Sequence, residues 1–246
     1  MIIRTSRDIK KLGIILSVWA HPDDESFSAA GILFTARQNG QKVCCVTATR
    51  GELGVQDESR WPATKLGKIR ETEMQNALRV LNIDCHHWLG YPDGACNKVD
   101  RTDAIDKIVK IINHVQPDTV LTFGPTGTTG HGDHIAIGQW TQGALDKAKL
   151  TKPVVLYHSV VSKERHERIG KKLDEKFDIY FNINEPPLVA NADMDICFDL
   201  PRMACAAKIA ALRAQPSQTS NLFEHTKPED IEELCSCEGF VLAKKY

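Results

Sequence analysis

Two short clusters of histidine and carboxylate residues stand out in the sequence. The first, His21-Pro22-Asp23-Asp24-Glu25, puts one imidazole and three carboxylates within five residues. The second, His131-Gly132-Asp133-His134, carries two imidazoles three positions apart, so that both can face the same side at the start of a helix. Two histidines and one carboxylate with an open fourth position form the ligand set expected of a catalytic zinc ion.

The polar residues left over in the two clusters suit hydrolysis by a metal-activated water. Such a water needs a carboxylate to accept its proton and a hydrogen-bonding group to stabilise the oxyanion. Beyond three ligands, the clusters offer a spare aspartate and a spare histidine. The simpler alternative is that Asp23 or Asp24 only caps a helix and the two later histidines bind nothing. We favour the metal site because so many carboxylates at a buried strand end are costly without a counter-ion.

An alternation of strands and helices would position these clusters. Strands are predicted at residues 13–20, 42–49, 85–89, 119–123 and 153–158, and helices at residues 26–38, 64–81, 102–115 and 134–149. This order predicts an α/β fold, a Rossmann-like three-layer sandwich whose mainly parallel sheet has helices on both faces. Later in the chain we expect a helical or loop stretch at residues 163–175, strands near residues 177–183 and 193–198, and a helix at residues 201–214.

No linker, repeat or low-complexity tract divides the chain, so a single domain over residues 1–246 is expected. In sheets of this kind the ligand crevice lies at the carboxyl ends of the strands. Polar segments follow four of the predicted strands, at residues 21–25, 50–52, 91–94 and 130–134. We expect all four segments to converge on one face of the molecule.

Composition restricts the partners. The 31 Lys and Arg residues and the 32 Asp and Glu residues leave a formal net charge of -1, which argues against a nucleic acid or an anionic membrane as partner. No apolar run approaches the ~20 residues that span a bilayer, and residues 1–11 lack the apolar centre of a secretory signal. Neither a G-x-G-x-x-G nor a Walker sequence follows a strand. A cytoplasmic protein with a small-molecule substrate is expected.

The eight cysteines are scattered along the chain and lack the dense spacing of a disulfide scaffold. Most of them are expected to be reduced and buried. The pair in Cys235-Ser236-Cys237 is assigned a packing role, because a C-x-C sequence without a second pair is a weak metal signal.

The order of motifs resembles that of a known family. A-H-P-D-D-E at residues 20–25, followed by G-H-x-D-H at residues 130–134, is similar to the LmbE-like family of zinc N-acetylglucosaminyl deacetylases, which includes PIG-L. Similar R-G-E, Y-P-D-G and A-L-R-A-x-x-S-Q sequences occur at residues 50–52, 91–94 and 211–218, so the resemblance extends over nearly the whole chain. It implies removal of the acetyl group from an N-acetylated amino sugar or sugar conjugate.

By this resemblance, one zinc ion would be held by His21, Asp24 and His134. The same ligand set also suits non-haem Fe(II). A homo-oligomer would agree with the resemblance too, although no residue pattern locates an interface.

The resemblance also assigns the catalytic groups. Asp23 would be the general base, and His131 would stabilise the oxyanion and help the amine to leave. Asp133 would orient His131 through a hydrogen bond or, as a compatible alternative, cap the helix that opens at His134.

Four further residues match positions that line the substrate pocket in the family, namely Arg50, Glu52, Arg70 and Asp93. For Arg70 the alternative is a solvated helix face with i,i+4 charge pairs. The sequence departs from the family pattern in three places. Gly132 stands where proline is usual, Gln215 replaces a histidine expected near the pocket mouth, and Thr129 stands where some relatives carry an aromatic residue.

The Gln215 and Thr129 departures affect the expected substrate more than the hydrolytic chemistry, whereas Gly132 loosens the backbone between the two histidines. The alternatives are therefore an amidase acting on a thiol-linked sugar conjugate or another small amide, and a zinc-binding protein without catalysis. The lipid-linked version of the substrate is disfavoured by the lack of a membrane segment.

Overall fold

The computed structural model describes residues 2–183 and 185–246. Its strands are β1 (Ile15–Trp19), β2 (Val43–Thr47), β3 (Cys85–Trp88), β4 (Thr119–Phe123), β5 (Val155–Ser162), β6 (Leu188–Val189), β7 (Ile196–Asp199) and β8 (Cys237–Lys245). Its α-helices are α1 (Asp24–Gln38), α2 (Ala63–Val80), α3 (Arg101–Val115), α4 (Gly132–Lys147), α5 (Lys163–Arg165), α6 (Lys171–Phe177), α7 (Arg202–Arg213), α8 (Pro216–His225) and α9 (Pro228–Leu234). Within the described ranges, no helix combines the length and apolarity needed to cross a bilayer.

The described strands form one mostly parallel sheet in the order β3-β2-β1-β4-β5-β8-β7, with β6 beside β5. The strands from β3 to β5 run parallel to one another, and β8 lies antiparallel between β5 and β7. β1, β2 and β4 are buried along their whole length, as expected for central strands covered on both faces. The predicted α/β fold is therefore confirmed.

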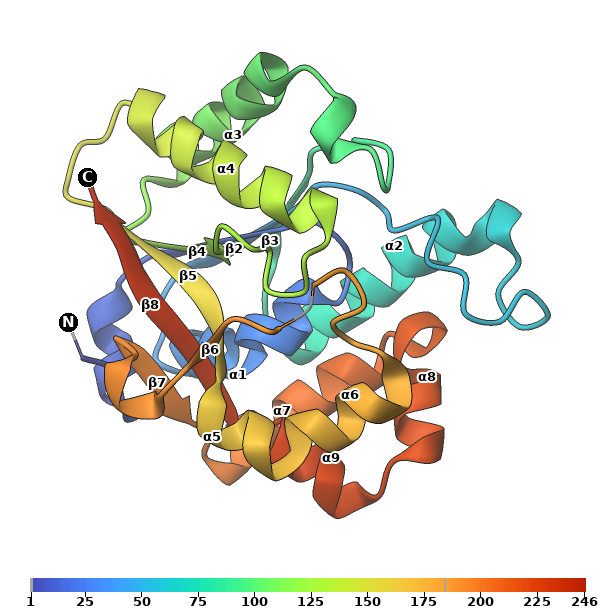
Figure 1. The fold of residues 1–246 in the computed structure, drawn as a ribbon. Helices are drawn as coiled ribbons and strands as arrows, with labels where there is room; N and C mark the ends of the chain where they lie inside the picture. Colours follow the sequence, from blue (N-terminus) through green and yellow to red (C-terminus); the bar gives the residue numbers. More distant parts are fainter. Residues whose placement is uncertain (1, 184) are drawn as a thin grey trace.

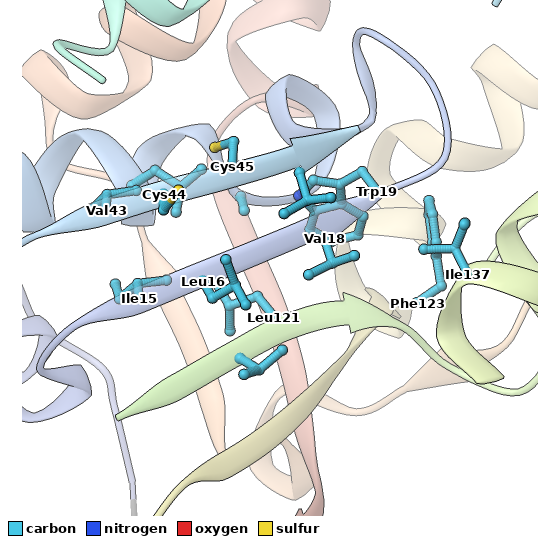
Figure 2. Close-up of a cluster of buried hydrophobic side chains, with 14 of the residues drawn as sticks. Ile15, Leu16, Val18, Trp19, Val43, Cys44, Cys45, Leu121, Phe123 and Ile137 are labelled. Atoms are coloured by element: carbon cyan, nitrogen blue, oxygen red, sulfur yellow. The ribbon is translucent and has the colours of Figure 1, made fainter. Parts of the chain in front are cut away.

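Helices cover both faces of the sheet (Figure 1). α3 packs against α4 on one face, whereas α1 packs against α7 on the other, with α2 also contacting α7. Between these layers, the apolar side chains of the central strands form the main core, which includes Val18, Trp19 and Phe123 (Figure 2). Trp19 meets the edge of the Phe123 ring, with ring centroids 4.8 Å apart. This core fixes the strand ends from which the polar clusters emerge.

One sequence-based prediction is wrong. Residues 177–183 form the end of α6 and a turn instead of a strand. Apolar residues in this segment are spaced as in a half-buried strand, but in the folded protein they line a cavity described below. The helices α8 and α9 and the strands β6 and β8 were not predicted; β8 fills the gap between β5 and β7.

A disulfide joins Cys44 and Cys85, which lie directly opposite each other on β2 and β3. The other six cysteines are free thiols, in agreement with the prediction that most are reduced. Disulfides are uncommon in reducing compartments. The cytoplasmic location therefore stays a prediction, and the state of this pair bears directly on it.

Candidate active site

The site lies where the carboxyl ends of β1, β3 and β4 meet. His21, Asp23 and Asp24 follow β1, Asp93 follows β3, and the segment 131–134 follows β4 and opens α4. Because β1 lies next to β4 in the sheet, the two polar clusters of the sequence come together there.

Three donor atoms face one another at the centre of the site. Nδ1 of His21 lies 3.2 Å from Nε2 of His134, which lies 3.3 Å from Oδ1 of Asp24. Nδ1 of His21 is 3.6 Å from Oδ2 of Asp24. Ligands bound tetrahedrally at 2.0–2.1 Å from a zinc ion lie about 3.4 Å apart. The residues His21, Asp24 and His134 therefore fit the spacing of a metal-binding triad.

The second nitrogen of each imidazole has its own partner. Nε2 of His21 lies 3.0 Å from Oδ1 of Asp93 and 3.3 Å from Oδ2 of Asp133. Nδ1 of His134 lies 2.9 Å from the carbonyl oxygen of Gly127, to which it can donate. These partners place the protons on the outer nitrogens and leave Nδ1 of His21 and Nε2 of His134 free to bind a metal. The ring of Phe123 stacks on His134 at 4.0 Å and holds its plane.

The charge of the site also favours a cation. Burial lowers the pKa of His21, but the carboxylates of Asp133, Asp24 and Asp93 outweigh this effect and leave the pKa well above its ordinary value. The site thus stabilises a positive charge at this imidazole, which a metal ion would supply in place of a proton. Burial instead lowers the pKa of His134 to about 4, so that this ring is neutral and able to act as a ligand.

Asp133 and Asp93 act differently from what the sequence predicted. Asp133 does not hold the side chain of His131 among the described contacts; its carboxylate faces His21 and accepts hydrogen bonds from the backbone N–H groups of Gly94 and Cys96. The cap of α4 is His131, whose Nδ1 accepts from the backbone N–H of Asp133 at 3.2 Å. Asp93, predicted to bind substrate, faces His21 as well. Asp93 reaches His21 from the loop after β3, one strand beyond the β2 neighbour of β1, and Asp133 reaches it from the start of α4, after the adjacent strand β4.

His131 lies next to the imidazoles of His21 and His134. Its ring centroid is 4.8 Å from that of His21 and 5.0 Å from that of His134. Because Nδ1 accepts a hydrogen bond, the neutral ring carries its proton on Nε2 and can donate it. His131 therefore has the form needed to stabilise an oxyanion beside the metal-binding triad.

Asp23 is held in an unusual conformation at the start of α1. Its φ of 99° lies in the left-handed region, which is strained for a residue other than glycine. The backbone N–H of Asp23 donates to the carboxylate of the buried Glu25, whose other oxygen contacts Gln215. Gln215 is buried under this turn, whereas Gln218 of the same late segment lines the cavity described below.

The other predicted substrate residues, Arg70, Glu52 and Arg50, lie outside the cavity that opens onto the site. Arg70 is buried and contacts Asp23, so the alternative of a solvated side chain is excluded. Glu52 accepts a hydrogen bond from the backbone N–H of Asp93 at 3.1 Å. The half-exposed Arg50 lies over the ring of Trp88. None of these three residues, nor Asp93, belongs to the walls of the cavity described next.

A cavity of about 720 Å³ opens onto two residues of the triad, Asp24 and His134, and onto Asp23, whereas His21 and His131 do not line it. This is within the usual range for small-molecule sites. Its opposite walls come from the second half of the chain and were missed by the sequence reasoning. Prominent among them are Ser159, Arg165, Tyr180, Lys208, Gln218 and Asn221. No local motif marks these residues, because they come from five separate segments.

Comparisons with known proteins agree with this site. Residues 16–145 match the family model PIG-L, described as GlcNAc-PI de-N-acetylase. The 1D-myo-inositol 2-acetamido-2-deoxy-alpha-D-glucopyranoside deacetylase of Actinosynnema mirum is 31% identical over 231 residues, covering 84% of this chain and 81% of that protein. The chain therefore belongs to the PIG-L, or LmbE-like, family of deacetylases, and it is an enzyme that hydrolyses amide bonds.

Two solved structures share the fold. The N,N'-diacetylchitobiose deacetylase of Pyrococcus horikoshii superposes with a TM-score of 0.68 at 21% identity, covering 96% of this chain and 86% of that one. The 4-carboxy-2-hydroxymuconate hydratase of Pseudomonas putida superposes with a TM-score of 0.55 at 16% identity, covering 94% and 96%. The same fold thus supports different reactions, and the substrate must be argued from the site.

Proposed function

We propose that this enzyme is a zinc-dependent N-deacetylase that acts on an N-acetylglucosamine unit carrying a further small group. The observation that carries the proposal is the spacing of the His21, Asp24 and His134 donor atoms, 3.2–3.6 Å apart, at the mouth of a cavity that also exposes Asp23. The donor set suits zinc best, and Fe(II) is the alternative ion.

The residues around the triad supply the proton transfers. When bound, zinc would supply the Lewis acidity that activates a water and polarises the acetyl carbonyl. Asp23 would accept a proton from this water as its oxygen bonds to the acetyl carbon, and the Nε2–H group of His131 would face the oxygen that becomes negative. The proton held by Asp23 is then available to the nitrogen as the C–N bond breaks, which releases acetate and a free amine.

The size of the cavity supports a conjugate instead of a free sugar. Its volume of about 720 Å³ leaves room for a second group beside a single hexosamine. The walls supply several hydrogen-bonding side chains suited to hydroxyl groups, among them Ser159, Gln218 and Asn221. The relative from Actinosynnema mirum is named for an inositol conjugate of this type. A thiol-linked sugar conjugate is the alternative substrate.

A non-catalytic metal-binding role is less well supported. Metal binding alone needs neither Asp23 nor its strained backbone, yet the chain holds this carboxylate in place with Arg70. A cytoplasmic location remains part of the proposal; analysing the Cys44–Cys85 pair in protein isolated from its native cells would test it.

The decisive experiment measures free amine released from a panel of acetylated sugars, with metal content determined on the same sample. The panel contains N-acetylglucosamine, its inositol conjugate, N,N'-diacetylchitobiose and a thiol-linked conjugate. We expect release from conjugates, and its loss on chelation and in Asp23→Asn. Metal-loaded protein that releases amine from no member of the panel would contradict the proposal.

A further inference from the structure

A second group of metal-ligating side chains lies at the far edge of the sheet. Cys197 of β7 and Cys237 of β8 are both buried, and their Sγ atoms are 3.9 Å apart. β7 and β8 lie side by side as antiparallel strands (Figure 1), with Cys197 opposite Gly239 and Asp199 opposite Cys237. Since side chains two positions apart point to the same face, these four positions form a square on one face of the sheet.

Three corners of this square carry ligand atoms. The Sγ atoms of Cys197 and Cys237 and a carboxylate oxygen of Asp199 lie within 4.8 Å of one another. The fourth corner, Gly239, has no side chain, and Met194 fills the space: a Cβ at Gly239 would lie 2.6 Å from the Met194 sulfur. Met194 packs with the two cysteines in one small cluster. Two thiols, a thioether and a carboxylate are thus gathered around one point.

The separation of the thiols fits a bridging ion. Two sulfur ligands bound tetrahedrally at ~2.3 Å from zinc lie about 3.8 Å apart. A disulfide is less suitable, since diagonal positions of an antiparallel pair have Cα atoms about 7–8 Å apart, beyond the usual disulfide range. By contrast, the disulfide-bonded Cys44 and Cys85 are directly opposite, with Cα atoms 4.6 Å apart.

Two arginines donate hydrogen bonds to the backbone of the same cluster. Arg4 donates from Nη2 to the carbonyl oxygen of Met194 at 2.8 Å, and Arg165 donates from Nη1 to the carbonyl oxygen of Cys237 at 2.9 Å. These contacts fix the backbone on two sides of the cluster. The positive charges also offset the negative charge that two thiolates and a carboxylate bring to a zinc ion.

We propose that Cys197, Cys237 and Asp199 bind a second, thiophilic divalent ion, for which Zn²⁺ is the best fit, with Met194 or a water as the fourth ligand. The ion would tie β7 to β8 at the edge of the sheet. Asp199 is exposed, so the ion can enter from solvent. Cys235 takes no part, because it packs in a separate cluster with Leu212 and Ile231.

Zinc counting on the full chain tests the proposal. After incubation with zinc chloride and removal of excess, we expect two ions per chain in the wild type and one in Cys197→Ser or Cys237→Ser. His134→Ala should also retain one ion. Deacetylation by Cys197→Ser, assayed with one zinc ion bound, should continue, because Cys197 does not line the substrate cavity. Cys205→Ser, at another free thiol, is the matched control and should keep both ions.

A spectroscopic measurement on Co²⁺-loaded protein avoids dependence on the folding of a cysteine variant. His134→Ala loaded with Co²⁺ should show a sulfur-to-metal charge-transfer band, and bound zinc should protect Cys197 and Cys237 from alkylation. One zinc per wild-type chain that Cys197→Ser still binds, no such band, or a Cys197–Cys237 disulfide in the isolated protein would overturn the proposal. None of these outcomes bears on the catalytic triad, so the proposed deacetylase function is tested separately.

Discussion

Nη2 of Arg70 lies 3.2 Å from Oδ2 of Asp23, and the same nitrogen donates to the carbonyl oxygen of Pro22 at 2.6 Å. Nη1 donates to the carbonyl oxygen of Gly51 at 2.8 Å. One side chain of α2 thus joins the loops that follow β1 and β2 and contacts the carboxylate between them. Burial raises the pKa of Asp23 to about 8, and the positive charge of Arg70 opposes that rise. Arg70 therefore acts as a positioning residue for Asp23.

Asp23→Asn should keep the catalytic metal and lose most of the turnover. The amide retains the shape of the side chain but cannot accept a proton, which is expected to lower kcat by about 100-fold or more. Metal content and amine release measured on the same preparation check this. Loss of the ion together with activity would show that Asp23 is a ligand instead of the base.

Arg70→Lys should reduce kcat by about 10-fold with little change in KM, because Arg70 positions Asp23 and does not line the cavity. One ammonium group cannot reach the three acceptors that the guanidinium serves, so the free energy of unfolding should fall by about 1–3 kcal/mol. Steady-state kinetics far below the melting temperature separate the two effects. The matched control is Arg79→Lys on the exposed side of α2; an increase in KM alone would place Arg70 in the substrate site.

Asp93→Asn and Asp133→Asn should each weaken zinc binding by about 10-fold to 100-fold. Both carboxylates lie within 3.3 Å of the outer nitrogen of His21, and such partners orient a ligand histidine and raise its basicity. Competition with a chelator of known affinity measures the change. Asp84→Asn, in an exposed side chain, should leave the affinity unchanged. Unchanged affinity in both site variants would contradict the assignment of His21 as a ligand.

Gly132→Pro should stabilise the protein by about 0.4–1 kcal/mol. Gly132 is the first residue of α4, a position that favours proline, and the extended backbone of His131 suits a residue that precedes proline. The nearest atom to a Cβ at Gly132 is Asn97 Nδ2 at 3.7 Å, so there is space for the ring. Urea unfolding gives the difference. Gly40→Pro, at a φ of +78°, should destabilise instead; a loss in both variants would mean that the turn before α4 needs glycine.

His86 should make the fold sensitive to acid. Burial lowers its pKa from 6.5 to about 4, so between these values the unfolded chain binds a proton that the folded chain does not. The contribution of His86 to the free energy of unfolding is fully present above pH 6.5. It falls as the pH drops toward 4, by about 2 kcal/mol at pH 5. In urea unfolding, His86→Gln should lose less stability than the wild type between pH 7.5 and pH 5. Equal losses would contradict the prediction, and the exposed His114→Gln serves as control.

The sequence allowed the central fold to be predicted from local patterns, whereas the choice of His21, Asp24 and His134 as ligands follows from the family resemblance and stays a prediction. The apolar runs around Val18 and Val46 identify buried parallel strands, and adjacent strand ends bring His21 and His134 together. The partners of Asp133 could not be predicted in this way. Its carboxylate lies within reach of His21 and of the Gly94 and Cys96 backbone only in the folded sheet, whereas the family resemblance pointed to His131.

The cavity walls were missed for a related reason. Their side chains come from the loop around Tyr180, from β5 and from helices α7 and α8, and none of these segments carries a motif of its own. The aromatic and aliphatic residues near Tyr180 alternate as a strand would, although they form a turn that faces the cavity.

The proposed reaction chemistry and most of the far wall of the cavity are carried by separate stretches of the chain. The proposed metal ligands, base and oxyanion donor all lie between His21 and His134, within the span matched by the family model, whereas the facing wall comes mainly from residues 159–239. Mutations in the later stretch can therefore alter which conjugate is accepted, while the residues proposed to cleave the amide stay unchanged. In evolution, as in engineering, new substrate ranges should arise most readily by exchange of the last third of the chain.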